Sequence, residues 1–467
     1  MLFPTIEFWL FLAIVFVLFW TLVRRPLLWK ALLLAASYVF YAWWDARFVL
    51  LLAAATAINF TGGLAIARAA GRTAKAFLAA TVATDLALLG WFKYYGFVSL
   101  NADGAFAAIG LASPLPLVQV TLPVGISFFT FMGISYVVDV YRRALTPAGA
   151  LDFAVYLSFF PHLVAGPIVR GAELLPQLAQ RARDHQVDFA RAATLILGGL
   201  FKKVVLSTFL ATSLVDPVFA LPAQHGGAEA LVAVYAYAVQ IWADFSGYTD
   251  IAIGVALLLG FRFPDNFDAP YAATSLRDFW RRWHMTLSRW LRDYLYIPLG
   301  GSRSGELLTA RNLVITMILG GLWHGAAWTF VAWGALHGMG QVVERAIGGR
   351  LAVPSSPVTR WAGRLVTFHT VCLGWVLFRS DSLSSARDLL VGLTRWDTTA
   401  GLVTPPVLAT VALALLYQLA PRSMPGALAA LFARLGPVPQ GAVIGAGLAG
   451  ISYLGPAGVP PFIYYRF

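Results

Sequence analysis

The chain has 467 residues, of which 59% are hydrophobic and only 12% are charged, and its formal net charge is +12. A mean hydropathy of +0.73 excludes a soluble globular protein and indicates a polytopic membrane protein with a single multi-helix domain. In such a protein an excess of Lys and Arg reports orientation in the membrane, so lipid is the expected surroundings and no nucleic-acid partner is expected.

Apolar segments of membrane length fill the first third of the chain. They predict helices at residues 8–23, 27–44, 48–67, 77–95 and 122–141. The first has no basic leader and no small-residue cleavage site, so we expect a retained helix. Basic residues gather in alternate loops, which places the N-terminus outside and the first, third and fifth loops in the cytoplasm. The fourth loop, residues 96–121, holds no Lys or Arg and is expected outside.

Residues 151–169 are apolar but have arginines at both ends, which argues against a crossing of the membrane. Pro161, Gly166 and Pro167 break the second half of this segment. We therefore expect a re-entrant or interfacial segment, with an ordinary short span as the alternative.

The next predicted span, residues 204–218, follows Lys202 and Lys203, which are assigned to a cytoplasmic loop. The return segment, residues 230–259, contains the polar sequence WADFSGYTD. Polar side chains are costly in lipid, so they should line a polar interior or cap a helix break near Gly247. The candidates in this sequence for substrate contact are Asp244, Ser246 and Tyr248.

Residues 275–294 carry the densest charge in the sequence and predict one amphipathic helix. At helical spacing one stripe collects polar side chains and the neighbouring face collects Trp and Leu. A helix of this kind lies near the lipid headgroups or covers a core, because its five arginines could not cross lipid. The stripe consists of Arg277, Arg281, His284, Ser288 and Arg292, with His284 at the seam between the two faces.

Beyond Arg311 the sequence GLWHGAAW interrupts an apolar segment with glycines around His324. One long tilted passage would fit residues 312–344, but the glycines favour two limbs of half the membrane depth that meet at residues 324–327. Further spans are predicted at residues 365–378, 403–419 and 438–454, with their orientation left open. We divide the single domain into N-terminal helices (1–147), a catalytic core (148–347) and C-terminal helices (348–467).

An ionisable residue inside a membrane is a candidate for function. Burial favours a neutral imidazole, so His324 is suited to act as a general base that takes a proton from a hydroxyl. Direct transfer of an acyl group from a thioester would then need no covalent enzyme intermediate. A core histidine bonded to a backbone carbonyl is the structural alternative.

The other polar residues could support that chemistry. His284 could orient the acyl donor or stabilise the thioester oxygen, and the arginines of its stripe could hold phosphates, although contact with lipid headgroups would explain them equally. Further candidates for substrate contact are Trp323, Asn312 and His337. No metal site is expected, because no close His or carboxylate pairing on one helix occurs, and the single cysteine, Cys372, lies in an apolar run.

Several stretches together resemble the membrane-bound O-acyltransferase (MBOAT) family, in its bacterial branch that modifies alginate and teichoic acid. They include LPVGISFFTFMGISYVVDVYR, YLSFFPHLVAGPIVR, WADFSGYTDIAIGVALLLGFRFPDNFDAPY, DFWRRWHMTLSRWLRDYLYIPLGG, GGLWHGAAWTFVAWGALHG and FIYYRF. The resemblance implies that His324 is the essential histidine and that His284 is a second polar site residue. It also implies an all-α fold of about 10–13 transmembrane and re-entrant helices around a central tunnel, with an amphipathic helix on the cytoplasmic side.

The resemblance further implies an inner-membrane O-acetyltransferase. The acyl donor would be acetyl-CoA or an acyl carrier thioester, with no permanently bound cofactor, and the acceptor would be an extracytoplasmic polysaccharide reached with a periplasmic partner of the SGNH type. Three alternatives stay open at this point. They are a transporter or flippase, a non-catalytic scaffold for polysaccharide secretion, and D-alanyl transfer to teichoic acid.

Overall fold

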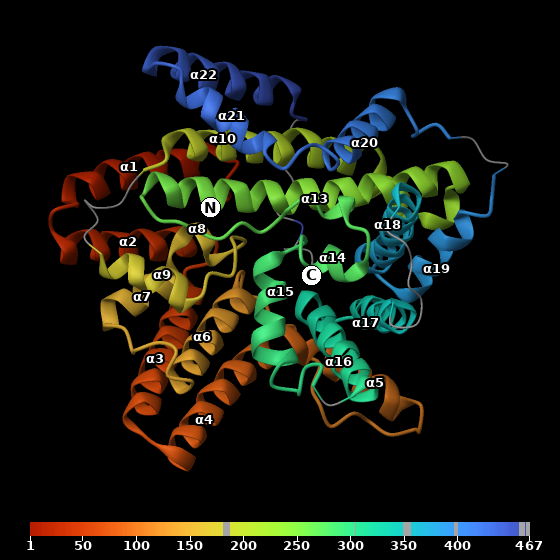
Figure 1. Ribbon diagram of the computed structural model, residues 1–467. Coiled ribbons are helices and arrows are strands. Elements are labelled where there is room, and N and C mark those ends of the chain that lie inside the picture. The colour runs from red at the N-terminus through yellow and green to blue at the C-terminus, as the bar shows by residue number, and fades with distance from the viewer. Residues whose placement is uncertain (181–186, 304, 349–355, 397–399, 457–462, 464–467) are drawn as a thin grey trace. The chain divides into compact units, whose positions relative to one another are not determined.

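The computed structural model describes the chain except for residues 181–186, 304, 349–355, 397–399, 457–462 and 464–467. Throughout the described residues every regular element is a helix, which confirms the all-α prediction (Figure 1). Six of the helical segments are long and apolar enough to cross a membrane. The chain forms two compact units, residues 1–188 with 255–264, and residues 189–254 with 265–467.

The helices of the first unit confirm the spans predicted for the N-terminal third. They are α1 (Ile6–Leu22), α2 (Pro26–Ala42), α3 (Arg47–Arg68), α4 (Gly71–Leu89), α5 (Tyr95–Ala107), α6 (Ile126–Tyr141), α7 (Ala150–Ser158), α8 (Phe160–Leu163) and α9 (Gly171–Ala179). A π-helical turn, Gly90–Tyr94, joins α4 to α5 without a break. The loop predicted at residues 96–121 therefore begins only after Ala107, because residues 96–107 contain no proline and the helix continues through Gly96 and Gly104.

The segment predicted to be broken at residues 151–169 is broken. Helix α7 has nine residues and α8 has four, and residues 164–170 contain no helix. At 1.5 Å per residue neither helix can span a bilayer by itself. Gly125, whose φ of 78° suits only glycine, passes the carbonyl oxygen of Leu163 so closely that an added Cβ would lie 2.6 Å from it.

The second unit begins with one helical segment from Phe189 to Ala220. It consists of α10 (Phe189–Leu200), α11 (Thr208–Leu210) and α12 (Asp216–Ala220), joined by π-helical turns at Phe201–Ser207 and Ala211–Val215. The assignment of Lys202 and Lys203 to a loop is therefore wrong. Both lysines lie in the middle of a membrane-length helix, and their carboxylate partners lie on the helix that follows.

That following helix, α13 (Gly227–Leu258), has 32 residues and is continuous. The prediction of a break near Gly247 is wrong for a physical reason. Gly247 lets two helices touch, since a Cβ added there would lie 2.7 Å from the carbonyl oxygen of Gly199 on α10. The polar residues of α13 are instead accommodated by side chains from the neighbouring helix, which is the polar interior expected as the alternative.

Residues 275–294 do not form one amphipathic helix, so that prediction is also wrong. Helix α14 (Leu276–Trp280) ends before a turn at His284, and α15 (Met285–Leu291) begins after it and leads into a π-helical turn at Arg292–Tyr296. His284 has a left-handed backbone, with φ 41° and ψ 55°. The single polar stripe drawn across these residues therefore does not exist, and His284 is buried rather than at a seam.

The two limbs predicted around residues 324–327 are confirmed. Helices α16 (Glu306–His324) and α17 (Trp328–Gly348) turn back on each other at Gly325, Ala326 and Ala327, and the two run side by side (Figure 1). An added Cβ on Gly321 would lie 2.2 Å from the carbonyl oxygen of Phe330, and one on Gly334 would lie 2.4 Å from that of Met317. The prediction that the limbs reach only half the membrane depth is wrong, because α16 has 19 residues and α17 has 21, and α16 is long and apolar enough to cross a membrane by itself.

The remaining helices of the second unit are α18 (Pro357–Arg379), α19 (Leu383–Gly392), α20 (Pro405–Tyr417), α21 (Met424–Ala433) and α22 (Pro437–Leu454). Helices lie at the three predicted C-terminal segments, as α18, α20 and α22, of which α18 has the length and hydropathy of a membrane span, whereas α19 and α21 were not predicted. Helix α18 begins at a capping box in which Ser356 and Thr359 bond each other's backbone N–H, with Pro357 at the first helical position. Its interior residue Cys372 is buried.

Candidate functional site

His284 is wholly buried in the turn between α14 and α15. Its Nδ1 lies 3.2 Å from the side-chain oxygen of Asn266. The same oxygen accepts hydrogen bonds from the backbone N–H of Thr286 at 3.1 Å and from the hydroxyl of Thr286 at 2.9 Å. Because the Thr286 N–H can only donate, the Asn266 atom must be the oxygen, and Nδ1 of His284 must carry the proton.

This tautomer leaves the lone pair of His284 on Nε2. That nitrogen is buried and has no hydrogen-bond partner among the residues that the structure describes. Burial lowers the pKa of His284 from 6.5 to about 3, so the ring is neutral at physiological pH. At this position the protein therefore offers a hydrogen-bond acceptor, which can receive a proton or hold an N–H or O–H group.

His324 is the last residue of α16, at the turn into α17, and only 3% of it is exposed. Its imidazole is enclosed by aromatic rings. The ring centroid lies 5.0 Å from Trp323, 5.1 Å from Trp333 and 5.2 Å from Phe378. Gly325 permits the sharp turn, since a Cβ on it would lie 2.1 Å from the Phe330 ring. The predicted placement of His324 at the meeting point of the two limbs is confirmed.

Indole rings connect three histidines in one row. The ring of Trp323 lies 6.0 Å from that of His284 and 5.0 Å from that of His324, and the ring of Trp333 lies 5.1 Å from His324 and 4.8 Å from His337. His337 is fully buried, and neither of its ring nitrogens has a hydrogen-bond partner within the described parts of the chain. Three of the residues singled out in the sequence, together with Trp323, are thus brought into one cluster.

The polar residues of α13 are occupied by lysines. Asp244 pairs with Lys203, and Asp250 pairs with Lys202, whose ammonium group also donates to the hydroxyl of Ser246 at 3.1 Å. Tyr248 is buried. Next to Asp244 on the helix, the Phe245 ring lies edge-on to the His284 ring with centroids 4.6 Å apart. This part of α13 therefore contacts the histidine cluster through Phe245, and its two aspartates are paired with lysines.

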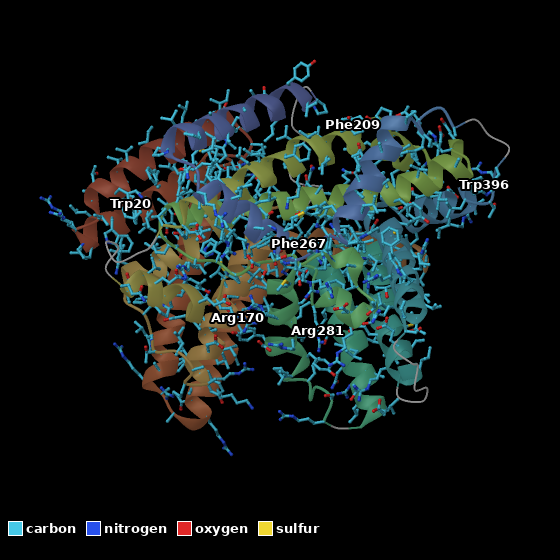
Figure 2. The ribbon with its side chains drawn as sticks, turned by 45° about the horizontal axis from the view of Figure 1, so that its top comes forward. Trp20, Arg170, Phe209, Phe267, Arg281 and Trp396 are labelled. Atoms are coloured by element: carbon cyan, nitrogen blue, oxygen red, sulfur yellow. The ribbon has the colours of Figure 1, made fainter. Side chains whose placement is uncertain are left out.

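The predicted arginine stripe does not join the cluster. Arg277 and Arg281 are exposed, and Arg281 lies at the end of α14 (Figure 2). Arg292 is exposed and pairs with its neighbour Asp293 at 2.6 Å. Ser288 donates to the carbonyl oxygen of Trp283 at 3.2 Å, and the buried Asn312 donates to that of Gly301 at 3.0 Å, so both have local structural partners.

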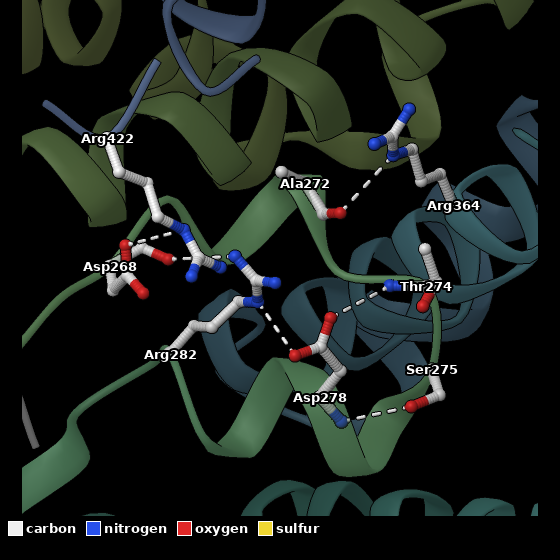
Figure 3. Close-up of polar contacts among 8 residues, drawn as sticks. All are labelled: Asp268, Ala272, Thr274, Ser275, Asp278, Arg282, Arg364 and Arg422. Atoms are coloured by element: carbon white, nitrogen blue, oxygen red, sulfur yellow. Dashed lines mark hydrogen bonds and ion pairs between the residues drawn. The ribbon is translucent and has the colours of Figure 1, made fainter. Parts of the chain in front are cut away.

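Ion pairs brace the segment that leads to His284 (Figure 3). Arg282 bonds Asp278 one turn earlier at 2.8 Å, and Arg422 pairs with Asp268 at 3.3 Å. Ser275 caps α14 by accepting from the N–H of Asp278 at 3.0 Å. Glu344 on α17 accepts from the N–H of Leu276 at 2.6 Å, which ties α14 to the α16–α17 hairpin.

Sequence reasoning missed the residues that arrange the cluster. Asn266 sets the tautomer of His284, Trp333 joins His324 to His337, and Lys203 balances Asp244. A signal existed only for the lysine, since two basic residues next to apolar runs and two aspartates in the next span could have been matched by charge. Within the described residues no group of three or more His, Cys, Asp or Glu is placed to hold a metal ion.

Comparison with known proteins identifies the family of the chain. Residues 126–384, which contain the whole histidine cluster, match the family described as MBOAT, membrane-bound O-acyltransferase family. The probable alginate O-acetylase AlgI of Pseudomonas aeruginosa is 47% identical over 360 residues, which cover 76% of this chain and 68% of that protein.

Two further relatives act on other polymers according to their names. The peptidoglycan O-acetyltransferase of Helicobacter pylori is 36% identical over 402 residues, covering 79% of this chain and 74% of that protein. The teichoic acid D-alanyltransferase of Streptococcus thermophilus is 29% identical over 279 residues, covering 54% of this chain and 67% of that protein. With the family matching over this length, the chain belongs to the membrane-bound O-acyltransferase family and is a multi-pass membrane O-acyltransferase.

Proposed function

We propose that this enzyme moves an acetyl group from a cytoplasmic thioester to a hydroxyl group of an extracytoplasmic polysaccharide or of a periplasmic transfer partner. The observation that carries the proposal is the row of imidazole and indole rings from His284 through His324 to His337 within the matched region. The names of two of these relatives, an alginate O-acetylase and a peptidoglycan O-acetyltransferase, support acetyl as the group and a polysaccharide as the acceptor.

In the proposed reaction His324 is the general base. It takes the proton of the acceptor hydroxyl while the hydroxyl oxygen attacks the thioester carbonyl. The carbon–sulfur bond breaks, and the proton held by His324 goes to the leaving thiolate, which restores the neutral imidazole. The enclosing rings of Trp323, Trp333 and Phe378 keep bulk water away from the imidazole and so favour transfer over hydrolysis.

His284 could either orient the donor or stabilise the thioester oxygen. The bond to Asn266 leaves an acceptor at Nε2, and a thioester oxygen needs a hydrogen-bond donor. We therefore propose that His284 orients a substrate by accepting a hydrogen bond from an N–H or O–H group. Such a group occurs in the amide-containing arm of acetyl-CoA and of carrier-protein thioesters alike.

The exposed arginines Arg277 and Arg281 are proposed to attract the phosphates of the donor at the cytoplasmic surface, where Arg292 would contribute despite its pairing with Asp293. The acceptor side would involve an SGNH-type periplasmic partner. This arrangement requires the inner membrane, an N-terminus outside the cytoplasm, and a tunnel that joins the two sides near His324.

The proposal is tested with the purified full-length chain in lipid nanodiscs, given radiolabelled acetyl-CoA and a soluble oligosaccharide acceptor with the partner present. Replacing His324 by Ala should lower the rate of acetyl transfer at least about 100-fold, the contribution typical of a general base. The matched control is His369→Asn. His369 is exposed on α18 and is not part of the cluster, and its Nε2 lies 2.8 Å from the hydroxyl oxygen of Tyr235.

Unchanged transfer by a folded His324→Ala variant would remove His324 from the mechanism. A parallel reaction with a D-alanyl carrier thioester distinguishes acetyl transfer from D-alanyl transfer to teichoic acid. Preferred use of the D-alanyl donor would replace the acetyl proposal while leaving the family assignment intact.

A further inference from the structure

A salt bridge lies inside the second unit, between two membrane-length helices. Lys203 on the Phe201–Ser207 turn pairs with Asp244 on α13, and the two side chains are only 2% and 4% exposed. Placing two charges in such surroundings costs several kcal/mol in desolvation, and a pair of apolar side chains would pack as well. Stability alone is therefore a weak reason for an ion pair at this position.

The carboxylate of Asp244 does more than balance a lysine. Its Oδ1 faces Lys203 and accepts from the hydroxyl of Ser207 at 3.1 Å. Its Oδ2 accepts from the backbone N–H of Ile463 at 3.0 Å, a bond between residues 219 positions apart in the chain. Ile463 itself is 5% exposed. The ion pair thus leaves Oδ2 of Asp244 to accept the hydrogen bond of the Ile463 backbone N–H.

We propose that Lys203 and Asp244 are positioning residues that anchor Ile463, through its backbone N–H, inside the unit that holds His284 and His324. Lys203 keeps the carboxylate ionised and its orientation fixed, and Asp244 supplies the acceptor. A hydrogen bond to an ionised acceptor is about twice as strong as a neutral one, so the charge serves the anchor directly.

The anchor is connected to the histidine cluster through one residue of α13. Phe245 follows Asp244 on α13, and its ring packs edge-on against the ring of His284 with centroids 4.6 Å apart. Loss of the anchor should therefore disturb transfer without removing any group that touches substrate. The expectation about transfer rests on the proposed function, whereas the anchoring of Ile463 does not.

The experiment follows the reactivity of a cysteine at the anchored position. Ile463→Cys keeps the backbone N–H, and Cys372→Ala removes the natural cysteine, so that a maleimide reports on residue 463 alone in the full-length chain. Two double variants are compared in this background. Lys203→Met with Asp244→Leu removes both charges and the acceptor, and Lys203→Met with Asp244→Asn removes both charges but keeps one amide oxygen for the Ile463 N–H.

Both variants avoid an unpaired buried charge, which would be strongly destabilising. The matched control is Arg191→Met with Asp265→Leu, which removes an ion pair from the same helix where the side chains are 46% and 61% exposed. We expect the Leu variant to be labelled at least about tenfold faster than the parent, as expected for loss of a bond to a charged acceptor. The control should stay within about twofold of the parent, because it keeps the charged acceptor of Ile463. The Asn variant should fall between the parent and the Leu variant, because its amide oxygen is a neutral and therefore weaker acceptor.

Equal labelling of the parent and a folded Leu variant would overturn the proposal. If the Leu variant does not fold, hydrogen exchange of the Ile463 amide in the unaltered protein decides, since an anchored amide exchanges slowly and free exchange overturns the anchor. Acetyl transfer is measured on the same samples. A fall in kcat that appears in the Leu variant and is rescued in the Asn variant supports the link to the cluster, while fast labelling with unchanged transfer leaves the anchor standing and removes that link.

Discussion

His284 shows how a neighbour decides what a buried imidazole can do. Because Nδ1–H is bonded to Asn266, the lone pair of the ring is on the buried Nε2. An Asn in this place is neutral, so the imidazole gains no charge from it, and burial keeps the ring unprotonated. The choice of Asn over Asp at residue 266 therefore matters as much for the chemistry as the histidine does.

Changing Asn266 to Asp should bring His284 into titration. A carboxylate next to Nδ1–H stabilises the imidazolium form, which raises the pKa of His284 from its present value of about 3. Acetyl transfer by this variant should therefore decline at mildly acidic pH where the wild type is still active. Recording the pH dependence of kcat for both proteins tests this expectation, and identical profiles would contradict it.

The same shift makes stability depend on pH. The unfolded chain binds a proton at His284 below pH 6.5, whereas the folded chain does not until about pH 3. The unfolded state is thus favoured as the pH falls from 6.5, by up to about 1.4 kcal/mol per pH unit. Thermal unfolding in detergent between pH 7 and 5 should show a shallower loss for His284→Asn than for the wild type. Equal slopes would mean that the ring is not held neutral.

At the level of elements, the α16–α17 hairpin holds His324 at its tip. Its two helices meet along a seam where glycines lie directly against the backbone of the other helix. Gly334 faces the backbone of Met317, and Gly321 faces that of Phe330. Backbone atoms cannot turn aside as a flexible side chain can, so the separation of the two helices is set by these glycines. The position of His324 relative to Trp333 depends on that separation.

Replacing Gly334 by Ala should force the two helices apart. Overpacking of this kind costs about 1–3 kcal/mol, and it should also lower acetyl transfer because the Trp333 ring moves with α17. Gly348→Ala on the same helix is the control, since no atom lies within 4 Å of its added Cβ. Melting temperature and transfer are measured together. A Gly334→Ala protein that matches the control would show that the seam has slack.

Sequence reasoning succeeded for elements wherever apolar length or a glycine cluster gave a local signal. The N-terminal helices and the turn at His324 are examples. It failed where a long-range partner decided the outcome. Lys202 and Lys203 read as loop residues because their partners lie more than 40 positions away, and the turn at His284 was read as helix because the Asn266 contacts that hold it are not encoded nearby.

At the scale of the whole molecule, the inside loops keep their excess of positive charge after two lysines are reassigned to a helix. The prediction that the N-terminus lies outside therefore rests on the remaining loops, and it places Arg47, at the start of α3, outside and Arg72, at the start of α4, inside.

Cysteines at these two positions test the orientation. In a Cys372→Ala background, Arg47→Cys should react with a membrane-impermeant maleimide in intact spheroplasts, while Arg72→Cys should react only after the membrane is opened. Both arginines are exposed, so differences in burial do not confound the comparison. The reverse pattern would invert the assignment and place the proposed thioester side of the enzyme outside the cell.

Two widened turns within fifteen residues, Phe201–Ser207 and Ala211–Val215, bear on how insertions could have shaped this enzyme. Each holds more residues than an α-helical turn and rotates everything after it about the axis. Lys202 and Lys203 are consecutive in the first of these turns, and both reach carboxylates on the same neighbouring helix. Deleting the residue before Lys202 would turn both lysines by about 100° relative to the preceding helix, so this pairing should not tolerate a deletion there.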